Sequence, residues 1–213
     1  SGVKYYQDYM DMLAQHLDIS IVSICTPIHL HKRMAISTME KGFNVFVEKP
    51  PAATIQDMDA MIFAQEKYGV LCGVNFQNTS GKAFRMLIRK LREGVLGDIR
   101  SVSGVGMWKR TNDYYERNDW AGKLILGGSY ILDGTINNPF AHLVNNCLIT
   151  AGCGDVVNLG LKSVQAELYK GHDIEGEDTA CIRILTADGI EIRIYTTLCH
   201  TENALPYIRV EGT

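Results

Sequence analysis

The 213-residue sequence has no long hydrophobic run, no excess of positive charge and no paired cysteine motif. No apolar stretch approaches the roughly 20 residues that a membrane-spanning helix needs. Lysine and arginine number 21 against 24 aspartates and glutamates, which gives a net charge of −3. A dedicated nucleic-acid-binding protein usually carries a strong basic excess. We therefore expect a globular protein that binds neither membrane nor nucleic acid.

The six cysteines include no C-x-x-C pair, and most lie inside apolar stretches. A free cysteine in such a stretch behaves as a small buried hydrophobe. We therefore expect reduced core thiols and a cytoplasmic protein, with a disulfide or a metal ligand as the alternatives. Among the histidines only His29 and His31 are close in sequence, so no metal site is expected.

An initiator methionine, a signal peptide and a complete glycine-rich phosphate loop are also absent. The chain starts at Ser1 and stops at Thr213, directly after a strand-like run. We interpret it as a piece of a longer protein, and an export signal ahead of Ser1 stays an open alternative. The segment Gly104-Val105-Gly106 lacks the third glycine of a G-x-G-x-x-G motif.

The first 80 residues alternate short apolar runs with helical segments. The apolar runs lie at 19–25, 45–47 and 70–74. Helix-like segments of 10–15 residues separate them, and Thr54 has the residue type of a helix N-cap. Strands that are apolar throughout and alternate with helices are typical of a parallel sheet covered on both faces. Residues 1–80 are therefore predicted to form an α/β domain with a parallel sheet.

The pattern changes after Ser80. A charged helical segment, a strand-like run, a polar loop and an apolar helix near 139–150 come first. Four alternating runs then follow, at 156–168, 179–185, 190–198 and 207–210. The sequence Thr186-Ala187-Asp188-Gly189 between two of them indicates a hairpin. This succession predicts a second, α+β domain over residues 81–213, with an open antiparallel sheet.

The charged helical segment after Ser80 carries five basic residues: Lys82, Arg85, Arg89, Lys90 and Arg92. A solvated helix face explains such a cluster. Contact with a phosphate or another anion is the alternative.

Reactive side chains follow two of the predicted parallel strands. Thr26-Pro27 ends the first of these strands, and Glu48-Lys49 ends the second. In an open α/β sheet, ligands bind beyond the carboxyl ends of the strands. The structural alternative is that Pro27 and Pro50 only terminate the strands and that Lys49 is exposed and has no catalytic role. A lysine in such a position can also donate a hydrogen bond to a substrate hydroxyl and relay a proton.

A second group of polar residues lies in the segment 127–146. Asn138-Pro139 is typical of an N-cap followed by proline at the first helical position. His142 then lies in the first turn, where the helix dipole favours the neutral imidazole that a general base requires. Asn145 and Asn146 share its face of the helix, which favours a polar cavity. A hydrogen-bonded structural histidine is the alternative to a catalytic one.

Three sequence motifs together resemble the Gfo/Idh/MocA oxidoreductases. An apolar strand that ends in Thr26-Pro27, His31 four residues later, and a strand that ends in Glu48-Lys49-Pro50 resemble the second half of that family's nucleotide domain. The segment 127–137 resembles its G-G-x-x-x-x-D-x-G-x-H motif, and 177–180 resembles the start of its substrate-domain sheet. The resemblance covers essentially the whole chain.

The resemblance implies a partial Rossmann-type dinucleotide-binding domain over residues 1–80. It also implies a substrate and oligomerisation domain over 81–213, truncated at its C-terminus. The expected activity is an NAD- or NADP-dependent oxidation or reduction at a hydroxyl-bearing carbon of a sugar, inositol or similar polyol. An NAD-dependent glycoside hydrolase and a non-catalytic binding or regulatory relative are the alternatives. A homo-oligomer that forms through the antiparallel sheet is also implied.

The family's cofactor-binding positions fall on five residues of this sequence. Thr26, Pro27 and His31 are implied to line the nicotinamide side of NAD or NADP. Glu48 and Lys49 are implied to border both cofactor and substrate. Because the main phosphate-binding loop is absent, we expect these 213 residues alone to bind the dinucleotide poorly and to be inactive.

The catalytic positions match the family less closely. Lys49 is implied to polarise the reacting hydroxyl, and Asp133 falls on the motif's aspartate. The motif's histidine falls on Asn137, which cannot take up a proton, and its glycine falls on Thr135. Either His142 replaces the missing histidine from one turn further along, or Lys49 works with Asp133, or the chemistry differs. Lys49, Asp133, Asn137 and His142 are therefore the catalytic candidates.

Overall fold

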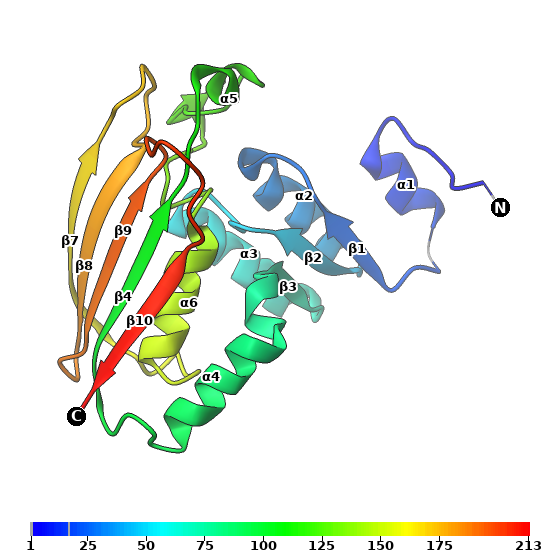
Figure 1. The fold of residues 1–213 in the computed structure, drawn as a ribbon. Helices are drawn as coiled ribbons and strands as arrows, with labels where there is room; N and C mark the ends of the chain where they lie inside the picture. Colours follow the sequence, from blue (N-terminus) through cyan, green and yellow to red (C-terminus); the bar gives the residue numbers. More distant parts are fainter. Residues whose placement is uncertain (1, 17) are drawn as a thin grey trace. The chain divides into compact units, whose positions relative to one another are not determined.

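The structure is a computed structural model that describes residues 2–16 and 18–213. Its contacts divide the chain into two compact units, with the boundary between Asn75 and Phe76. Figure 1 shows the elements of each unit. Among the described residues, no helix is both long enough and apolar enough to cross a bilayer.

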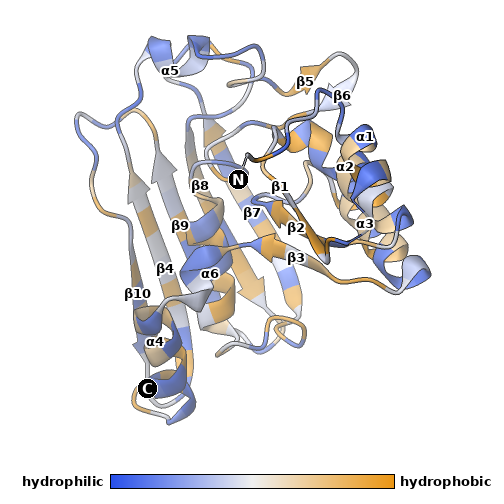
Figure 2. Cartoon of the chain, turned by 90° about the vertical axis from the view of Figure 1, so that its right-hand side faces the viewer, coloured by the Kyte–Doolittle hydropathy of each residue, from blue (hydrophilic) through white to orange (hydrophobic). Residues whose placement is uncertain are grey.

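The first unit contains a three-stranded parallel sheet in the order β1-β2-β3. Its strands are β1 (Ile21–Ile24), β2 (Asn44–Glu48) and β3 (Cys72–Asn75), and its helices are α1 (Tyr9–Gln15), α2 (Ile28–Glu40) and α3 (Ile55–Tyr68). In register, Val22 pairs with Val45 and Val47 pairs with Val74. The predicted alternation of parallel strands and helices is confirmed, and the hydrophobic strands of this sheet are visible in Figure 2.

Local signals in the sequence set the ends of the helices in this unit. The Thr54 hydroxyl accepts a hydrogen bond from the Asp57 backbone N–H at 3.1 Å and caps α3. Gly69 ends the same helix in the left-handed region, with φ of +64°, where glycine avoids the strain of a side chain. The helices then pack on the strands through the buried side chains of Ala35, Met39 and Met61.

The second unit contains a five-stranded sheet in the order β10-β4-β9-β8-β7, visible in Figure 1. The strands are β4 (Ile99–Met107), β7 (Leu161–Tyr169), β8 (Thr179–Thr186), β9 (Glu191–Thr197) and β10 (Tyr207–Gly212). The helices are the 3-10 turn η1 (Gln77–Ser80), α4 (Lys82–Arg92), α5 (Asn112–Glu116) and α6 (Ala141–Ala151), and a small ribbon pairs β5 (Ile125–Leu126) with β6 (Ser129–Tyr130).

This sheet is mixed, whereas the alternating runs predict an antiparallel one. Three of its ladders are antiparallel, but β4 pairs with β9 in parallel, with Val102 opposite Ile192. The chain between these two strands includes α6, so they meet through a crossover rather than a hairpin. The hairpin predicted at 186–189 is confirmed, because Thr186 donates its backbone N–H to the Ile190 carbonyl at 3.0 Å.

Two predicted boundaries are displaced. The strand predicted from residue 156 begins only at Leu161, because the chain turns through Gly154 and Gly160, both at positive φ. The helix predicted near 139 begins at Ala141, with Phe140 as its N-cap, so Asn138-Pro139 lies in the preceding turn. His142 still lies in the first turn of α6.

The cysteines are all free, but they are less buried than their apolar neighbours predict. Only Cys147 is fully buried, and burial raises the pKa of its thiol to about 12. Cys25 and Cys199 are exposed, since each lies just beyond a strand rather than in the core. The prediction of core thiols is therefore wrong for these two positions.

Helix α6 covers one face of the second sheet (Figure 1). Its Leu143 and Cys147 pack against Val102 and Ile194 of the strands. At Gly106 of β4 a side chain is excluded, since an added Cβ would lie 2.3 Å from the Phe140 ring. This close packing fixes the N-terminal end of α6, and with it His142.

Candidate functional site

His31 joins the loops that follow the first two parallel strands. Its Nε2 atom lies 2.8 Å from the carbonyl oxygen of Thr26, and its Nδ1 atom lies 2.9 Å from that of Pro50. The ring is 1% exposed. A neutral imidazole has one N–H to donate, whereas the doubly protonated ring donates to both carbonyls. In either form the histidine holds the two strand ends at the carboxyl edge of the sheet.

Glu48 and Lys49 lie at this edge, at the end of β2. The Glu48 carboxylate accepts a hydrogen bond from the Asn75 side-chain amide at 2.6 Å, which ties β2 to the end of β3. Its other oxygen lies 3.3 Å from the Lys49 backbone N–H. Lys49 is half-buried, and its peptide bond to Pro50 is cis. The predicted cofactor residues of the first unit thus lie along one sheet edge.

Thr26 offers a polar atom that the described protein does not use. Its hydroxyl oxygen is buried and has no hydrogen-bond partner among the described residues. A buried hydroxyl without a partner is costly unless a ligand or water satisfies it. The Thr26 hydroxyl and the Glu48 carboxylate therefore give this sheet edge polar groups that fit a bound dinucleotide. The described residues provide no glycine-rich loop after β1 for its phosphates.

Asp133 is a buried carboxylate of the second unit. One oxygen accepts the Gly122 backbone N–H at 2.8 Å, and the other accepts the Asn138 side-chain amide at 2.7 Å. The side chain is 5% exposed. Asp133 thus links its own loop to the turns at Gly122 and Asn138 ahead of α6. Such contacts suit a residue that positions its neighbours.

Asn137 and His142 lie on either side of the start of α6. The Asn137 amide donates to the Leu132 carbonyl at 3.1 Å, so it holds the preceding loop. The His142 ring lies edge-on to Phe76, with 5.7 Å between ring centroids. A cavity of about 500 Å³ is lined by His142, Asn146, Trp108 and other residues of the second unit. His142 therefore faces a mostly apolar cavity of the size that small ligands occupy.

Glu177 is a titratable neighbour of this group that no catalytic motif of the sequence includes. Burial raises its pKa above the usual range, and the charges of Asp133 and Asp178 act in the same direction. An added Cβ at Gly134 would lie 2.0 Å from its carboxylate oxygens. The absence of a side chain at Gly134 therefore allows Glu177 to approach the Asp133 loop. No local pattern in the sequence indicates that Glu177 lies near Asp133, because 44 positions separate the two residues.

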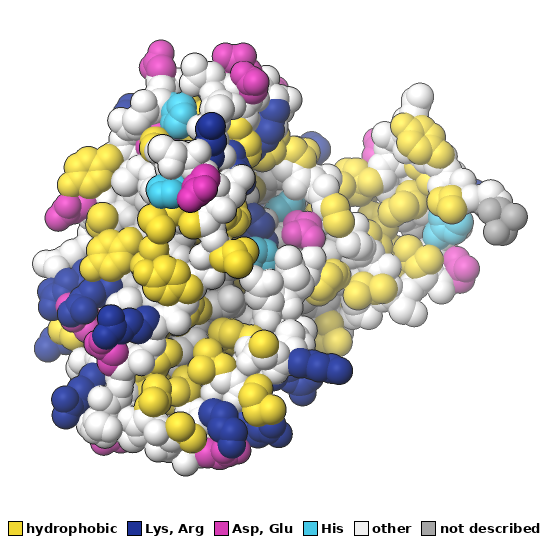
Figure 3. All heavy atoms as spheres, in the orientation of Figure 1, with side chains coloured by type: hydrophobic (Ala, Val, Ile, Leu, Met, Phe, Trp, Pro, Cys, Tyr) yellow, Lys and Arg dark blue, Asp and Glu magenta, His cyan; other side chains and the backbone are white. Residues whose placement is uncertain are grey.

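The basic cluster lies on α4, where Figure 3 shows Lys and Arg side chains gathered. Four of its members line a cavity of about 810 Å³: Lys82, Arg85, Arg89 and Arg92. Arg92 donates to the Cys153 carbonyl at 2.6 Å, and Arg89 lies 4.0 Å from Glu93. Helix-surface pairing and solvation account for most of this charge.

The site residues predicted from sequence divide between the two units. Thr26, Pro27, His31, Glu48 and Lys49 lie in the first, and Asp133, Asn137 and His142 lie in the second. Within the first unit the structure brings the predicted residues to one sheet edge. Within the second it groups them at the start of α6.

Comparison with known proteins agrees with this geometry. Residues 1–76 match a family described as "Oxidoreductase family, NAD-binding Rossmann fold", named GFO_IDH_MocA. The chain also superposes on the WlbA dehydrogenase from Bordetella pertussis, solved with NADH and UDP-GlcNAcA, with a TM-score of 0.85 and 27% identity over 97% of this chain and 61% of that one. Residues 1–76 of the chain are thus similar to the NAD-binding domain of the Gfo/Idh/MocA family.

Two curated relatives are named for different reactions. Levoglucosan dehydrogenase of Pseudarthrobacter phenanthrenivorans is 27% identical over 146 residues, which is 68% of this chain and 36% of the relative. A glycosyl hydrolase family 109 protein of Shewanella baltica is 35% identical over 91 residues, 43% of this chain and 20% of the relative. The chain thus spans about a third or less of the length of these relatives.

Proposed function

We propose that the protein is an NAD(P)-dependent dehydrogenase that acts on a hydroxyl-bearing carbon of a sugar or similar polyol. The observation that carries the proposal is the paired contact of His31 with the Thr26 and Pro50 carbonyls. It holds both strand ends of a sheet edge where α/β folds bind ligands. The family match over residues 1–76 supports a dinucleotide as the ligand class.

The bound nicotinamide supplies hydride transfer, and the protein supplies position and proton handling. In this proposal the Thr26 hydroxyl, buried and without a partner among the described residues, hydrogen-bonds the cofactor. Glu48, held by Asn75 at 2.6 Å, fixes the end of β2. Lys49, which follows it directly, donates a hydrogen bond to the reacting hydroxyl and polarises it.

The family resemblance also gives residues of the second unit proposed roles. His142 is the proposed proton carrier, because the motif histidine is replaced by Asn137. Asp133 acts by position, because both of its oxygens already hold the turns before α6. Asn137 acts the same way through its bond to Leu132.

A glycoside hydrolase that uses NAD transiently is a second candidate. The relatives named glycosyl hydrolase family 109 proteins reach 35% identity, higher than the 27% of the levoglucosan dehydrogenase match. Their matches cover fewer residues of this chain, 91 against 146. The dehydrogenase is therefore preferred, and the hydrolase is an outcome of the experiment below.

Self-association through the open face of the second sheet is part of the proposal. Opposite α6, the face presents Arg183, Arg193 and Tyr195 around a shallow depression of about 570 Å³. Figure 3 shows hydrophobic and basic side chains intermingled over this sheet, the mixture that interfaces favour. A cytoplasmic location is also proposed, since all six cysteines are free thiols.

The test compares Lys49→Ala with Lys32→Ala in the full-length protein. Lys32 is a matched control because it lies in the same unit and pairs with Asp57 at 2.6 Å. We expect Lys49→Ala to lower kcat/KM for NAD(P)-linked oxidation of a polyol panel by about a hundredfold or more, and Lys32→Ala to change it little. Equal activity in both variants contradicts the role of Lys49. Release of an aryl glycoside without net NADH favours the hydrolase, and cofactor binding without any turnover favours a regulatory relative.

A further inference from the structure

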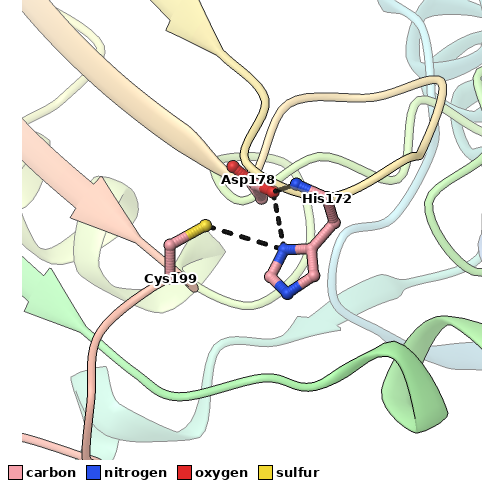
Figure 4. A group of neighbouring side chains, drawn as sticks. All are labelled: His172, Asp178 and Cys199. Carbon is pink, nitrogen blue, oxygen red and sulfur yellow. Dashed lines mark hydrogen bonds and ion pairs between the residues drawn. The ribbon is translucent and has the colours of Figure 1, made fainter.

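Three metal-ligating side chains of different types meet in the second unit, and one of them, Asp178, directly follows Glu177 in the sequence. They are His172 in the loop after β7, Asp178 just before β8, and Cys199 just after β9 (Figure 4). The His172 Nδ1 atom lies 2.8 Å from the Asp178 carboxylate and 3.6 Å from the Cys199 sulfur. All three ligand atoms lie within 4.8 Å of one another.

The surrounding backbone holds these side chains in place. Asp178 is fully buried, and its carboxylate accepts the backbone N–H groups of Gly171 at 2.9 Å and His172 at 2.8 Å. The Cys199 backbone N–H donates to the Thr197 hydroxyl at 3.0 Å. An added Cβ at Gly171 would lie 2.7 Å from the Cys199 sulfur, so only glycine lets the thiol come this close.

This geometry is not that of a nucleophilic triad. In such a triad the nucleophile and the acid contact different nitrogens of the histidine ring. Here Asp178 and Cys199 both lie against Nδ1. Burial and the hydrogen bond to Asp178 raise the pKa of Cys199, so the free thiol is not activated for attack.

The donor set instead suits a borderline-soft divalent cation. An imidazole nitrogen, a thiolate sulfur and a carboxylate oxygen are the ligands of zinc, whereas magnesium and calcium select oxygen alone. Tetrahedral zinc, with bonds of about 2.0–2.3 Å, places its ligand atoms roughly 3.3–3.8 Å apart. The two distances from His172 Nδ1, 2.8 Å to Asp178 and 3.6 Å to Cys199, lie near that range.

We propose that His172 Nδ1, the Asp178 carboxylate and the Cys199 sulfur form a three-ligand zinc site, with a water as the fourth ligand. A cavity of about 550 Å³, lined by Tyr115, Gly171 and His172, gives access to it. The Tyr115 ring lies 5.0 Å from that of His172, and its hydroxyl is buried without a hydrogen-bond partner among the described residues. A zinc-bound water in this cavity offers that hydroxyl a partner.

Binding is balanced by the release of one proton. The Cys199 thiol loses its proton to solvent as the sulfur binds zinc. His172 binds the metal as the neutral imidazole, with Nδ1 as the ligand and the ring proton on Nε2. Asp178 binds as the carboxylate it already is. The affinity for zinc should therefore rise with pH. The bound metal should also hold the loop after β7 against the chain after β9.

Cobalt titration of the full chain under reducing conditions tests the site. Co²⁺ bound to a thiolate gives a near-ultraviolet charge-transfer absorption that Zn²⁺ abolishes by displacement. We expect one cobalt per chain, loss of the band in Cys199→Ser, and an intact band in Cys25→Ser. Cys25 is the matched control because it is the other exposed cysteine and lies in the first unit.

A second variant keeps the result independent of folding defects at Cys199. We expect His172→Gln to weaken zinc affinity, measured by competition with a chromophoric chelator, about tenfold or more. One equivalent of zinc should also raise the Tm of the unchanged chain. A band that survives in Cys199→Ser overturns the proposal. Zinc affinity that is the same with and without the His172 imidazole overturns it as well and identifies adventitious binding only.

Discussion

The Nδ1 atom of His31 lies 2.9 Å from the carbonyl oxygen of Pro50, although 19 positions separate the two residues. The contact joins helix α2 to the loop after β2, across the carboxyl edge of the parallel sheet. Its partner bond, from Nε2 to the Thr26 carbonyl at 2.8 Å, joins the same helix to the loop after β1. One buried side chain thus fixes both loops that border the proposed nicotinamide site.

Replacement of His31 by leucine should therefore destabilise the first unit strongly. The variant retains similar bulk but leaves the Thr26 and Pro50 carbonyls without donors in a buried site. Each orphaned carbonyl costs roughly 1–3 kcal/mol, so we expect a loss of about 2 kcal/mol or more in the free energy of unfolding. Urea unfolding measures it.

His29→Leu is the matched control for this variant. His29 lies on the same helix, and its Nδ1 atom is buried without a hydrogen-bond partner among the described residues. We expect its replacement to change the free energy of unfolding by about 0.5 kcal/mol or less. Equal losses at positions 29 and 31 would show that the two carbonyl contacts contribute nothing specific.

Asp133 is predicted to act through the turns that it holds. Asp133→Ala strips a hydrogen-bond partner from the Gly122 backbone and from the Asn138 amide, with an expected cost of about 2 kcal/mol. Asp133→Asn keeps one acceptor and offers a donor to a flipped Asn138 amide, so most of the stability should return. Activity of the full-length protein should return with it, to within about tenfold. A stable Asn variant without turnover would instead mark Asp133 as a proton carrier.

Much of the first unit could be predicted because its signals are local. Continuous apolar runs gave β1, β2 and β3 within one to two residues, and Thr54 and Gly69 cap α3 as their residue types predict. The second unit depends more on pairing between distant segments. The alternation of apolar and polar residues in β4 and β9 does not show that they pair in parallel, because side chains alternate with the same period in parallel and antiparallel strands.

The same distinction separates the predicted and the missed site residues. Lys49 could be proposed as a site residue because a strand end and a proline flank it in the sequence. Glu177 could not, because its burial arises from contact with Gly134. His172 and Cys199 come together only when the β7–β8 loop folds back on the chain after β9. No spacing rule for metal ligands anticipates that approach.

His142 and Asn137 can be separated by activity. His142→Gln removes the proposed proton acceptor from the first turn of α6 but keeps a polar side chain. We expect it to lower kcat by about a hundredfold or more with little change in KM for the polyol. Asn137→Ala loses only its bond to Leu132 and should lower kcat by less than about tenfold. Steady-state assays of the full-length protein measure both values of kcat. A larger loss of kcat in Asn137→Ala than in His142→Gln would contradict the proposed role of His142 in proton transfer.

Replacement of Glu177 and of Glu175 by glutamine should change the free energy of unfolding at pH 7 in opposite directions. Burial raises the pKa of Glu177 in the folded state, so its ionisation costs stability once the pH exceeds the unfolded value. Glu177→Gln should therefore stabilise the protein at pH 7, and the gain should fade as the pH falls below the usual glutamate range. Unfolding by urea at several pH values measures the difference.

Glu175→Gln is the control two residues away. The backbone N–H of Leu124 and the side chain of Lys123 lower the pKa of Glu175, so its charge stabilises the folded state above the usual glutamate pKa. Its replacement should destabilise the protein at pH 7, with the loss disappearing in acid. If both variants shift stability the same way, the burial of Glu177 does not control its ionisation.

Gly106 tests how tightly the start of α6 is fixed on the sheet. An added Cβ would lie 2.3 Å from the Phe140 ring, which itself packs on Trp108 with 4.4 Å between centroids. Gly106→Ala should therefore cost about 1–3 kcal/mol in the free energy of unfolding. Phe140→Leu removes the ring atoms that clash, so the double variant should be more stable than the sum of the single effects predicts. Because His142 lies two residues after Phe140, we also expect Gly106→Ala to lower kcat, and additive effects in the cycle would contradict the proposed contact.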